Sequence, residues 1–366
     1  MEAIRKKEKE LPINWLRSLL LSLLVVQNSG SVLLQTHQPN NFLATTYNLV
    51  LVTEIIKLLL SCFIENYVTK GELLRSITEN VFLRPIDTLK MSIPAILFLV
   101  HNGLLYQAME RLPASIFQFT YQAKLILSAI LSVIMLNHNY SIKQWLCLTS
   151  MSLGAALLAL GSDGNIQRLR SYKSLHLPSF TTGLVSVTLA CLASSFSGVY
   201  FEKILKRNAN YARGNTTAST SMWMRSIQLS SFSILILLTK PILKFFWRLH
   251  YLGASLEDSS GIPLLQGFTP WIWALVWCQA IQGVLVIAVI GYADNVLKGM
   301  AIVISQVLVF GLSFLLFAST TTGLSNLGAL TILMSAFYFS NIRNNCTSLE
   351  EEEEENERSL HPIQIV

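Results

Sequence analysis

The chain has 366 residues, of which 52% are apolar and 13% are charged. The charged share is about half that of a typical soluble domain, and one soluble core of this size cannot enclose so many apolar side chains. A lipid bilayer is the solvent that suits this composition. The formal net charge of +6 is not arranged as a basic stripe with interleaved aromatic residues, so it does not indicate nucleic-acid binding.

Apolar runs long enough to cross a bilayer, about 17 to 25 residues each, recur along the chain. We expect ten transmembrane helices, five in each half. They are Trp15–Leu34, Leu43–Ile64, Met91–Met109, Ala114–Leu136, Ile142–Leu160, Phe180–Leu205, Trp223–Thr239, Trp271–Ile290, Ala293–Leu316 and Gly323–Phe339. An odd number of spans inverts the second half (about 180–340) relative to the first (about 15–161). The expected fold class is therefore an all-α membrane protein of the inverted-repeat transporter type.

An even number of spans puts both termini on one side of the membrane. Five basic residues flank the first span and place that side in the cytosol, because loops rich in Lys and Arg stay cytosolic; they are Arg5, Lys6, Lys7, Lys9 and Arg17. We therefore expect a cytosolic N-terminal segment (1–14), a transporter domain (15–340) and a cytosolic tail (341–366). The acidic run Glu350–Glu355 predicts that the tail is solvated and disordered.

Two lysines lie inside apolar segments, where an ionisable side chain is costly and usually marks a ligand pathway or a paired site. Lys124 is about ten residues from either end of the fourth span, which is too deep to reach the interface easily. Lys298 lies early in the ninth span, which occupies the equivalent place in the second half. Two lysines from symmetry-related helices, both facing a central cavity, would suit a phosphorylated anion.

Other buried charges have local partners. Glu54 and Lys57 are three residues apart on one helical face, so a structural ion pair and a ligand site are both open readings. Glu202 and Lys206 are four residues apart in the favourable order, which predicts a structural pair at the end of the sixth span. Arg225, at the start of the seventh span, is compatible with either role.

The third span contains the polar sequence His101-Asn102-Gly103, and polar residues at this depth usually face the bundle interior. A lone histidine in such a place is more often a packing residue than a proton relay. The sequence contains no metalloprotease motif, no paired catalytic carboxylates, no Ser/His/Asp set and no Walker loop. We therefore expect neither an enzyme nor a cofactor or metal site.

Five sequence motifs, in this order, resemble those of the nucleotide-sugar transporters, in the branch that carries UDP-galactose, UDP-N-acetylglucosamine and CMP-sialic acid. They are Thr53–Lys57 (TEIIK), Gln118–Lys124 (QFTYQAK), Ser197–Lys206 (SGVYFEKILK), Trp223–Gln228 (WMRSIQ) and Tyr292–Gly299 (YADNVLKG). Each motif alone is weak evidence, but five in the right order are specific.

The resemblance implies a drug/metabolite-transporter-like bundle in the Golgi or endoplasmic reticulum membrane. It implies uptake of a nucleotide sugar in exchange for the nucleoside monophosphate, and it places Lys124 and Lys298 on the nucleotide phosphate. The residues expected to bind substrate are Lys124, Lys298, Tyr121, Gln122, Asn102, Gln118, Phe117, Asn295, Ser226 and Tyr200. The residues expected to have structural or gating roles are Glu54, Lys57, Glu202, Arg225 and Asp294. A homodimer is left open.

Some positions depart from the family pattern, which commonly has Gln-Asn-Asn at 101–103, Tyr at Phe98 and Asn at Ser226. These departures touch the base-and-sugar side of the site more than the phosphate side. The segments Leu112–Phe117 and Val26–Ser29 resemble the UDP-galactose members, so UDP-galactose is the favoured substrate. The alternatives are UDP-N-acetylglucosamine, CMP-sialic acid, or an interaction protein that uses the same fold without transport.

Overall fold

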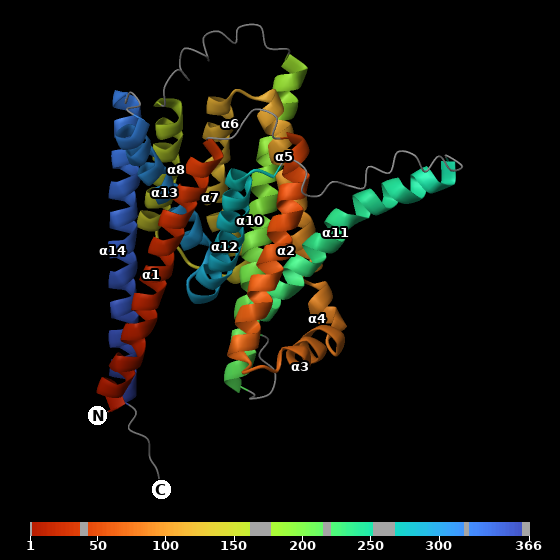
Figure 1. The fold of residues 1–366 in the computed structure, drawn as a ribbon. Helices are drawn as coiled ribbons and strands as arrows, with labels where there is room; N and C mark the ends of the chain where they lie inside the picture. Colours follow the sequence, from red (N-terminus) through yellow and green to blue (C-terminus); the bar gives the residue numbers. More distant parts are fainter. Residues whose placement is uncertain are drawn as a thin grey trace.

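The computed structural model of this chain describes residues 2–36, 43–161, 177–214, 221–251, 268–317 and 322–360 (Figure 1). The long helices are α1 (Glu2–Thr36), α2 (Leu43–Val68), α5 (Ser92–Arg111), α8 (Ile142–Gly161), α10 (Leu177–Gly214), α11 (Met222–Tyr251), α12 (Pro270–Tyr292), α13 (Asn295–Phe317) and α14 (Gly323–Leu360). A further long helical stretch is divided into α6 (Ala114–Tyr121) and α7 (Ala123–Leu136). The short α3 (Leu73–Ile77), η1 (Thr78–Phe82) and α4 (Pro85–Leu89) connect α2 to α5.

Within the described ranges, nine helical segments are long and apolar enough to cross a membrane. They overlap every expected span except the second, which corresponds to α2. That helix has 26 residues and carries three charged residues, Glu54, Lys57 and Glu65, which are unfavourable in a membrane span. The chain is a multi-pass α-helical membrane protein.

Helices α8 and α14 pack closely because glycines replace side chains along their contact. A Cβ added at Gly328 would lie 2.5 Å from the Leu158 backbone nitrogen and 2.6 Å from the Gly154 carbonyl oxygen, so only hydrogen fits there. Small residues that let two backbones approach are the usual way of packing helices in lipid, where the hydrophobic effect does not drive association.

Polar side chains join α1 to α12 and α13. Gln282 Nε2 donates to Asn28 Oδ1 at 2.5 Å, and Asn28 Nδ2 donates to Ser305 Oγ at 2.6 Å. Gln27 Nε2 also donates to the Cys278 carbonyl at 2.5 Å. Interhelical hydrogen bonds of this kind hold the register of helices that would otherwise slide in lipid.

The start of α1 and the end of α14 lie at the same end of the bundle (Figure 1). Helix α14 continues to Leu360, beyond the domain boundary expected at 340, so the acidic run Glu350–Glu355 lies on this helix. Likewise α1 begins at Glu2 and includes the expected N-terminal segment. Both membrane helices therefore extend past the same end of the bundle.

Candidate functional site

The helical stretch that carries Lys124 changes its hydrogen bonding at Gln122, between α6 and α7. The Gln122 N–H donates to the Phe119 carbonyl at 3.3 Å, and the Gln122 carbonyl accepts from the Leu125 N–H at 3.3 Å, so both bonds span three residues instead of four. Ser152 of α8 also donates to the Gln122 carbonyl, at 2.8 Å. Irregular backbone at membrane depth persists only where other groups satisfy it, as they do here.

Side chains of α10 bind the carbonyls on either side of this break. Cys191 Sγ lies 3.7 Å from the Tyr121 carbonyl oxygen, and Ser195 Oγ donates to the Lys124 carbonyl at 3.2 Å. Ser128 Oγ donates to Ser195 Oγ at 3.1 Å. These contacts fix the backbone of Lys124 against α10 and set the direction of its side chain.

Lys124 lies beside an aromatic stack. Its Nζ donates to the Tyr121 hydroxyl at 3.0 Å and lies 5.2 Å from the centroid of the same ring. The Tyr121 ring stacks on Phe117 with centroids 5.8 Å apart and on His101 with centroids 6.3 Å apart. His101 is held in turn by a 2.9 Å hydrogen bond between Nδ1 and the Ala190 carbonyl. The ammonium therefore has a weak neutral hydrogen-bond partner and a cation–π contact.

Lys298 is in the first turn of α13, and its Nζ donates to Asn295 Oδ1. The charges of Lys124 and Glu202 act on Lys298, and the charges of both lysines act on His101. We call Lys124, Lys298, His101 and Tyr121 the lysine centre. Two lysines from helices far apart in sequence act electrostatically on one another near the positive end of the α13 dipole, which is an arrangement that favours an anion.

The beginning of α13 is tied to α10. Glu202 is fully buried, and its Oε2 accepts the Asn295 backbone N–H at 2.9 Å. Its Oε1 accepts from Lys206 Nζ at 2.5 Å, which is the expected pair. One carboxylate thus compensates a lysine and an N-terminal amide of α13 that has no partner within its own helix.

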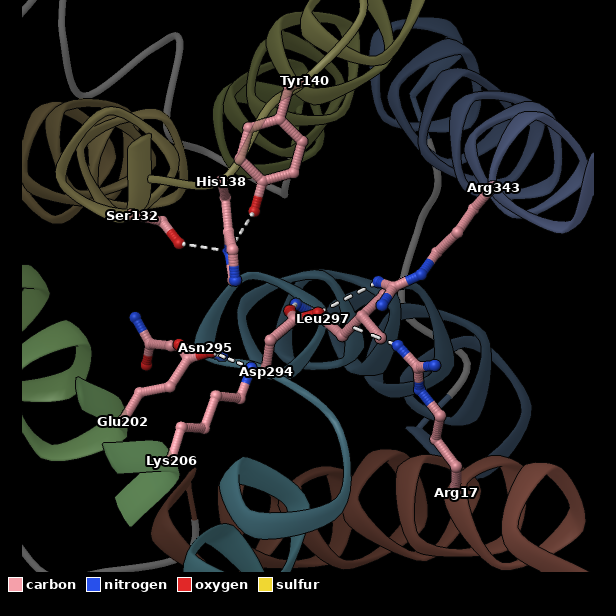
Figure 2. Close-up of polar contacts among 10 residues, drawn as sticks. All are labelled: Arg17, Ser132, His138, Tyr140, Glu202, Lys206, Asp294, Asn295, Leu297 and Arg343. Carbon is pink, nitrogen blue, oxygen red and sulfur yellow. Dashed lines mark hydrogen bonds and ion pairs between the residues drawn. The ribbon is translucent and has the colours of Figure 1, made fainter. Parts of the chain in front are cut away.

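Asp294, which precedes α13, is the centre of a second group of contacts (Figure 2). Its Oδ1 accepts the Leu297 N–H at 2.7 Å and so caps the helix, while its Oδ2 lies 3.0 Å from Arg343 Nη1 of α14 and 3.8 Å from Arg17 Nη2 of α1. We call Asp294 and these two arginines, together with the Glu202–Asn295 bond, the α13 anchor. It joins α1, α10, α13 and α14 at the end of the bundle where α1 begins.

Burial by itself would raise the pKa of Asp294, but the Arg343 guanidinium and the Leu297 amide stabilise the carboxylate more, so its pKa stays below the usual value. The carboxylate is therefore ionised at neutral pH, and the contact is lost only when the pH falls through that lowered pKa. Nearby, burial raises the pKa of Tyr140 to about 12, so its phenol stays neutral. Its hydroxyl and that of Ser132 lie 3.5 Å and 2.9 Å from His138 Nδ1 (Figure 2).

The remaining expected residues lie in separate contacts. Lys57 Nζ donates to Glu54 Oε1 at 2.7 Å, so these two residues form an ion pair in α2, which was one of the two readings of their spacing. Ser226 is fully buried, and its hydroxyl lies 2.6 Å from that of Ser61. Arg225 donates to Gln228 Oε1 at 2.9 Å and to the Asp87 carbonyl at 3.3 Å.

Four further candidates lie in different surroundings. The Tyr200 ring stacks on Phe196 with centroids 5.9 Å apart. Asn102 is half-buried next to His101, whereas Gln118 is exposed, one turn before the break. Gln122 is buried, and its Nε2 donates to Gln306 Oε1 of α13 at 3.4 Å. The structure thus joins Phe117, Tyr121, Gln122, Lys124, Lys298 and Asn295 around α7 and α13, and it places Ser226, Arg225, Glu54 and Lys57 in contacts of their own.

Sequence reasoning missed the break at Gln122, because no proline or glycine marks it, and it missed the arginines that bind Asp294. A usable signal existed for Arg343: it is a basic residue at the end of an apolar span, where a carboxylate of another helix is a suitable partner. The serines and the cysteine of α10 carry no signal of their own, since they resemble ordinary small packing residues.

Multi-pass helical bundles with ionisable groups beside a broken helix are typical of secondary transporters. A model of the family described as nucleotide-sugar transporter matches residues 13–340. The chain belongs to the nucleotide-sugar transporter family.

Several relatives match over most of their length. The UDP-galactose translocator of Mus musculus is 34% identical over 333 residues, which is 89% of this chain and 78% of the relative. The UDP-N-acetylglucosamine/UDP-N-acetylgalactosamine transporter of Caenorhabditis elegans is 33% identical over 339 residues, covering 88% and 93%. The UDP-N-acetylglucosamine transporter of Rattus norvegicus is 32% identical over 334 residues, covering 88% and 95%.

One protein of known crystal structure matches with a TM-score of 0.57 over 89% of this chain and 97% of its own. At 12% sequence identity, this match supports the fold alone.

Proposed function

We propose that this protein exchanges a UDP-sugar, with UDP-galactose favoured, for UMP across the Golgi membrane. The observation that carries the proposal is the lysine centre, in which the charge of Lys124, on the broken α6/α7 stretch, acts on Lys298 of α13 in a member of the nucleotide-sugar transporter family. A lysine ammonium is a compact point charge and a common phosphate ligand. A nucleotide diphosphate or monophosphate would neutralise both lysines at once.

The helix packing supports ten spans in two inverted halves. In that architecture each of the first five spans corresponds to the span five places later, so α1 corresponds to α10, α2 to α11, α5 to α12, α6/α7 to α13, and α8 to α14. A packed pair of helices should then have a counterpart in which each helix is replaced by its equivalent, and several pairs do: α1 with α13 matches α10 with α7, α1 with α12 matches α10 with α5, and α2 with α12 matches α11 with α5. This symmetry brings Lys124 and Lys298 to equivalent places.

Around the two lysines, we assign recognition of the nucleotide to Tyr121, Gln122, Gln118, Phe117 and Asn102. Aromatic rings beside a polar side chain suit a nucleobase and a ribose, because the ring faces stack while the amides bind hydroxyl and carbonyl groups. Ser226, Tyr200 and Asn295 complete the proposed substrate set.

The α13 anchor closes one end of the bundle in this proposal. Asp294 joins α13 to Arg343 and Arg17, and Glu202 joins it to α10, so access from that end requires these bonds to break. The end in question carries the basic first turns of α1, which we assign to the cytosol. The ion pair Glu54–Lys57 and the contacts of Arg225 stabilise helices that must keep their packing during the change.

Exchange rather than one-way transport follows from the buried charges. In the empty carrier the two lysines, whose hydrogen bonds to Tyr121 and Asn295 are to neutral groups, would have to move through a low-dielectric interior, which is costly. A bound phosphate removes that cost, so reorientation is coupled to occupancy in both directions. The proposal requires the lipid bilayer and the two nucleotides as partners, and neither a cofactor nor a catalysed reaction.

Assignment to the Golgi, with the endoplasmic reticulum as the alternative, rests on family resemblance, and so does the sugar. The relatives include proteins named for UDP-galactose and others named for UDP-N-acetylglucosamine at nearly equal identity. UDP-N-acetylglucosamine is therefore the first alternative substrate and CMP-sialic acid the second.

The test is uptake into proteoliposomes that contain the purified protein and are preloaded with UMP. A panel of labelled UDP-galactose, UDP-N-acetylglucosamine and CMP-sialic acid identifies the substrate, and protein-free liposomes give the background. Saturable uptake of one UDP-sugar that UMP inhibits supports the proposal. A folded, monodisperse protein that transports none of the panel would refute it and favour an interaction role for this fold.

A further inference from the structure

The amide side chain that contacts Lys298 has no freedom to turn away. Asn295 is 2% exposed, its backbone N–H donates to Glu202, and its Oδ1 accepts from Lys298 Nζ. An ammonium group can only donate hydrogen bonds, so the amide oxygen must face it and the amide nitrogen must face away. The backbone and the side chain of one residue therefore connect α10 to the lysine centre.

Helix α10 forms a closely fitting seat for this side chain. Gly198 and Glu202 are four residues apart, so they lie on one face of α10, one turn apart. A Cβ added at Gly198 would collide with Asn295 Oδ1 and would lie 2.9 Å from its Cγ and 3.0 Å from its Nδ2. Glu202, fully buried, holds the backbone of the same residue. No side chain larger than the hydrogen of glycine fits at position 198 while Asn295 keeps this position.

We propose that Asn295, seated by Gly198 and Glu202, positions Lys298 and is the neutral group that this ammonium exchanges for the substrate's phosphate. The inference rests on the proposed function, because it assumes that Lys298 binds a phosphate. It gives Asn295, Gly198 and Glu202 the role of positioning residues that act through the lysine.

The neutrality of the amide is the feature that matters chemically. A neutral oxygen satisfies one donor of Lys298 in the empty carrier and is displaced easily, because a phosphate offers a stronger charge-assisted hydrogen bond. A carboxylate in the same place would form a buried ion pair that competes with the phosphate. It would also add a second negative charge to that of Glu202, which already acts on Lys298, and so lower the cost of reorienting the empty carrier. The asparagine therefore links ready phosphate binding to obligatory exchange.

The first experiment replaces the amide by a carboxylate of nearly the same shape, Asn295→Asp. We expect the affinity for UMP, measured by competition against labelled UDP-sugar, to fall at least tenfold, which corresponds to about 1.4 kcal/mol. We also expect the ratio of uptake into UMP-preloaded liposomes to uptake into empty ones to fall toward one. A purely structural role would lower both uptakes together and leave that ratio unchanged, and this result would overturn the proposal.

The second experiment uses the close contact at Gly198. It is informative even if the Asn295→Asp variant is inactive. In the wild-type background, Gly198→Ala should reduce exchange at least tenfold, because its Cβ displaces the Asn295 side chain. In an Asn295→Ala background, which retains Lys298 and lacks all three atoms that the Cβ would meet, the same change should cost less than about twofold. The matched control is Gly311→Ala on α13, where an added Cβ meets nothing within 4 Å.

Additive effects of Gly198→Ala and Asn295→Ala would show that Gly198 does not act through the Asn295 side chain.

Glu202 is tested by conservative rescue: Glu202→Gln keeps an acceptor for the Asn295 N–H and should retain more exchange than Glu202→Ala. The proposed function and the positioning role of Asn295 are refuted by different results. Absence of exchange by the wild-type protein would refute the proposed function, whereas wild-type exchange with an unchanged Asn295→Asp variant would refute the positioning role alone.

Discussion

The α13 anchor makes a quantitative prediction through Arg343→Gln. Arg343 Nη1 lies 3.0 Å from Asp294 Oδ2, and the Asp294 side chain is only 6% exposed. Glutamine keeps a polar side chain at the end of α14 and removes the charge. Arg17 Nη2 remains 3.8 Å away, and the Leu297 N–H still caps the carboxylate. The change therefore removes one strong contact of several and should leave the fold intact.

The magnitude follows from the kind of bond that is lost. A hydrogen bond to a charged group contributes roughly 1.5–3 kcal/mol, and the remaining Arg17 places the expected loss near the lower limit, about 1.5–2 kcal/mol. Since each 1.36 kcal/mol is a factor of ten, the population in which the start of α13 is detached should rise about 10- to 30-fold.

Hydrogen exchange followed by mass spectrometry measures this population directly. The Asn295 amide is protected by Glu202 in the closed anchor, so peptides that contain 293–299 should exchange about 10- to 30-fold faster in the variant. Peptides of α8, which does not take part, should keep the wild-type rate. Arg75→Gln is the matched control, because Arg75 pairs with Glu72 and Glu79 at the surface, with its side chain 69% exposed, and such pairs contribute little.

Equal acceleration in all peptides would mean a loss of global stability and would contradict a local opening. An unchanged rate at 293–299 would show that the Asp294–Arg343 contact does not hold α13, and the gating role of the anchor would then be wrong.

Other predictions concern the lysines, the exchange and the topology. Lys124→Ala and Lys298→Ala should each abolish most exchange without loss of folding, because the phosphate would be uncompensated in a low-dielectric interior, and Lys124→Arg should rescue poorly because a planar fork does not replace a point charge. Near-normal uptake by either alanine variant would remove that lysine from the site. Preloading with UMP should accelerate uptake of UDP-galactose, and external UMP but not free galactose should compete; equal stimulation by CMP or GMP would contradict the uridine assignment. None of the three glycosylation sequons should carry N-glycan, as tested by glycosidase digestion, because all are expected on the cytosolic side; they begin at Asn139, Asn345 and Asn215, the last of which lies outside the described residues.

The sequence by itself determined the class of protein. Apolar runs that recur along the chain leave no soluble alternative, since each run would have to be buried in a core that the chain is too short to provide. The lysines of the fourth and ninth spans were also identifiable, because the cost of a charge in lipid makes such residues informative without any tertiary structure. The pair Glu202–Lys206 was predicted correctly because helix geometry fixes it locally, and the same geometry allowed the contact between Glu54 and Lys57, for which a ligand site was the other reading.

Only the tertiary structure decided which polar groups meet across helices. The break at Gln122 exists because Ser152 of α8 satisfies the carbonyl there while Cys191 and Ser195 of α10 bind the carbonyls beside it, and no local sequence rule reports such distant partners. Asp294 was a candidate from its motif, but its partners Arg17 and Arg343 lie almost the whole chain apart. Sequence periodicity defines the faces of a helix, whereas the packing of helices decides which faces meet, and the anchor and the lysine centre both depend on that packing.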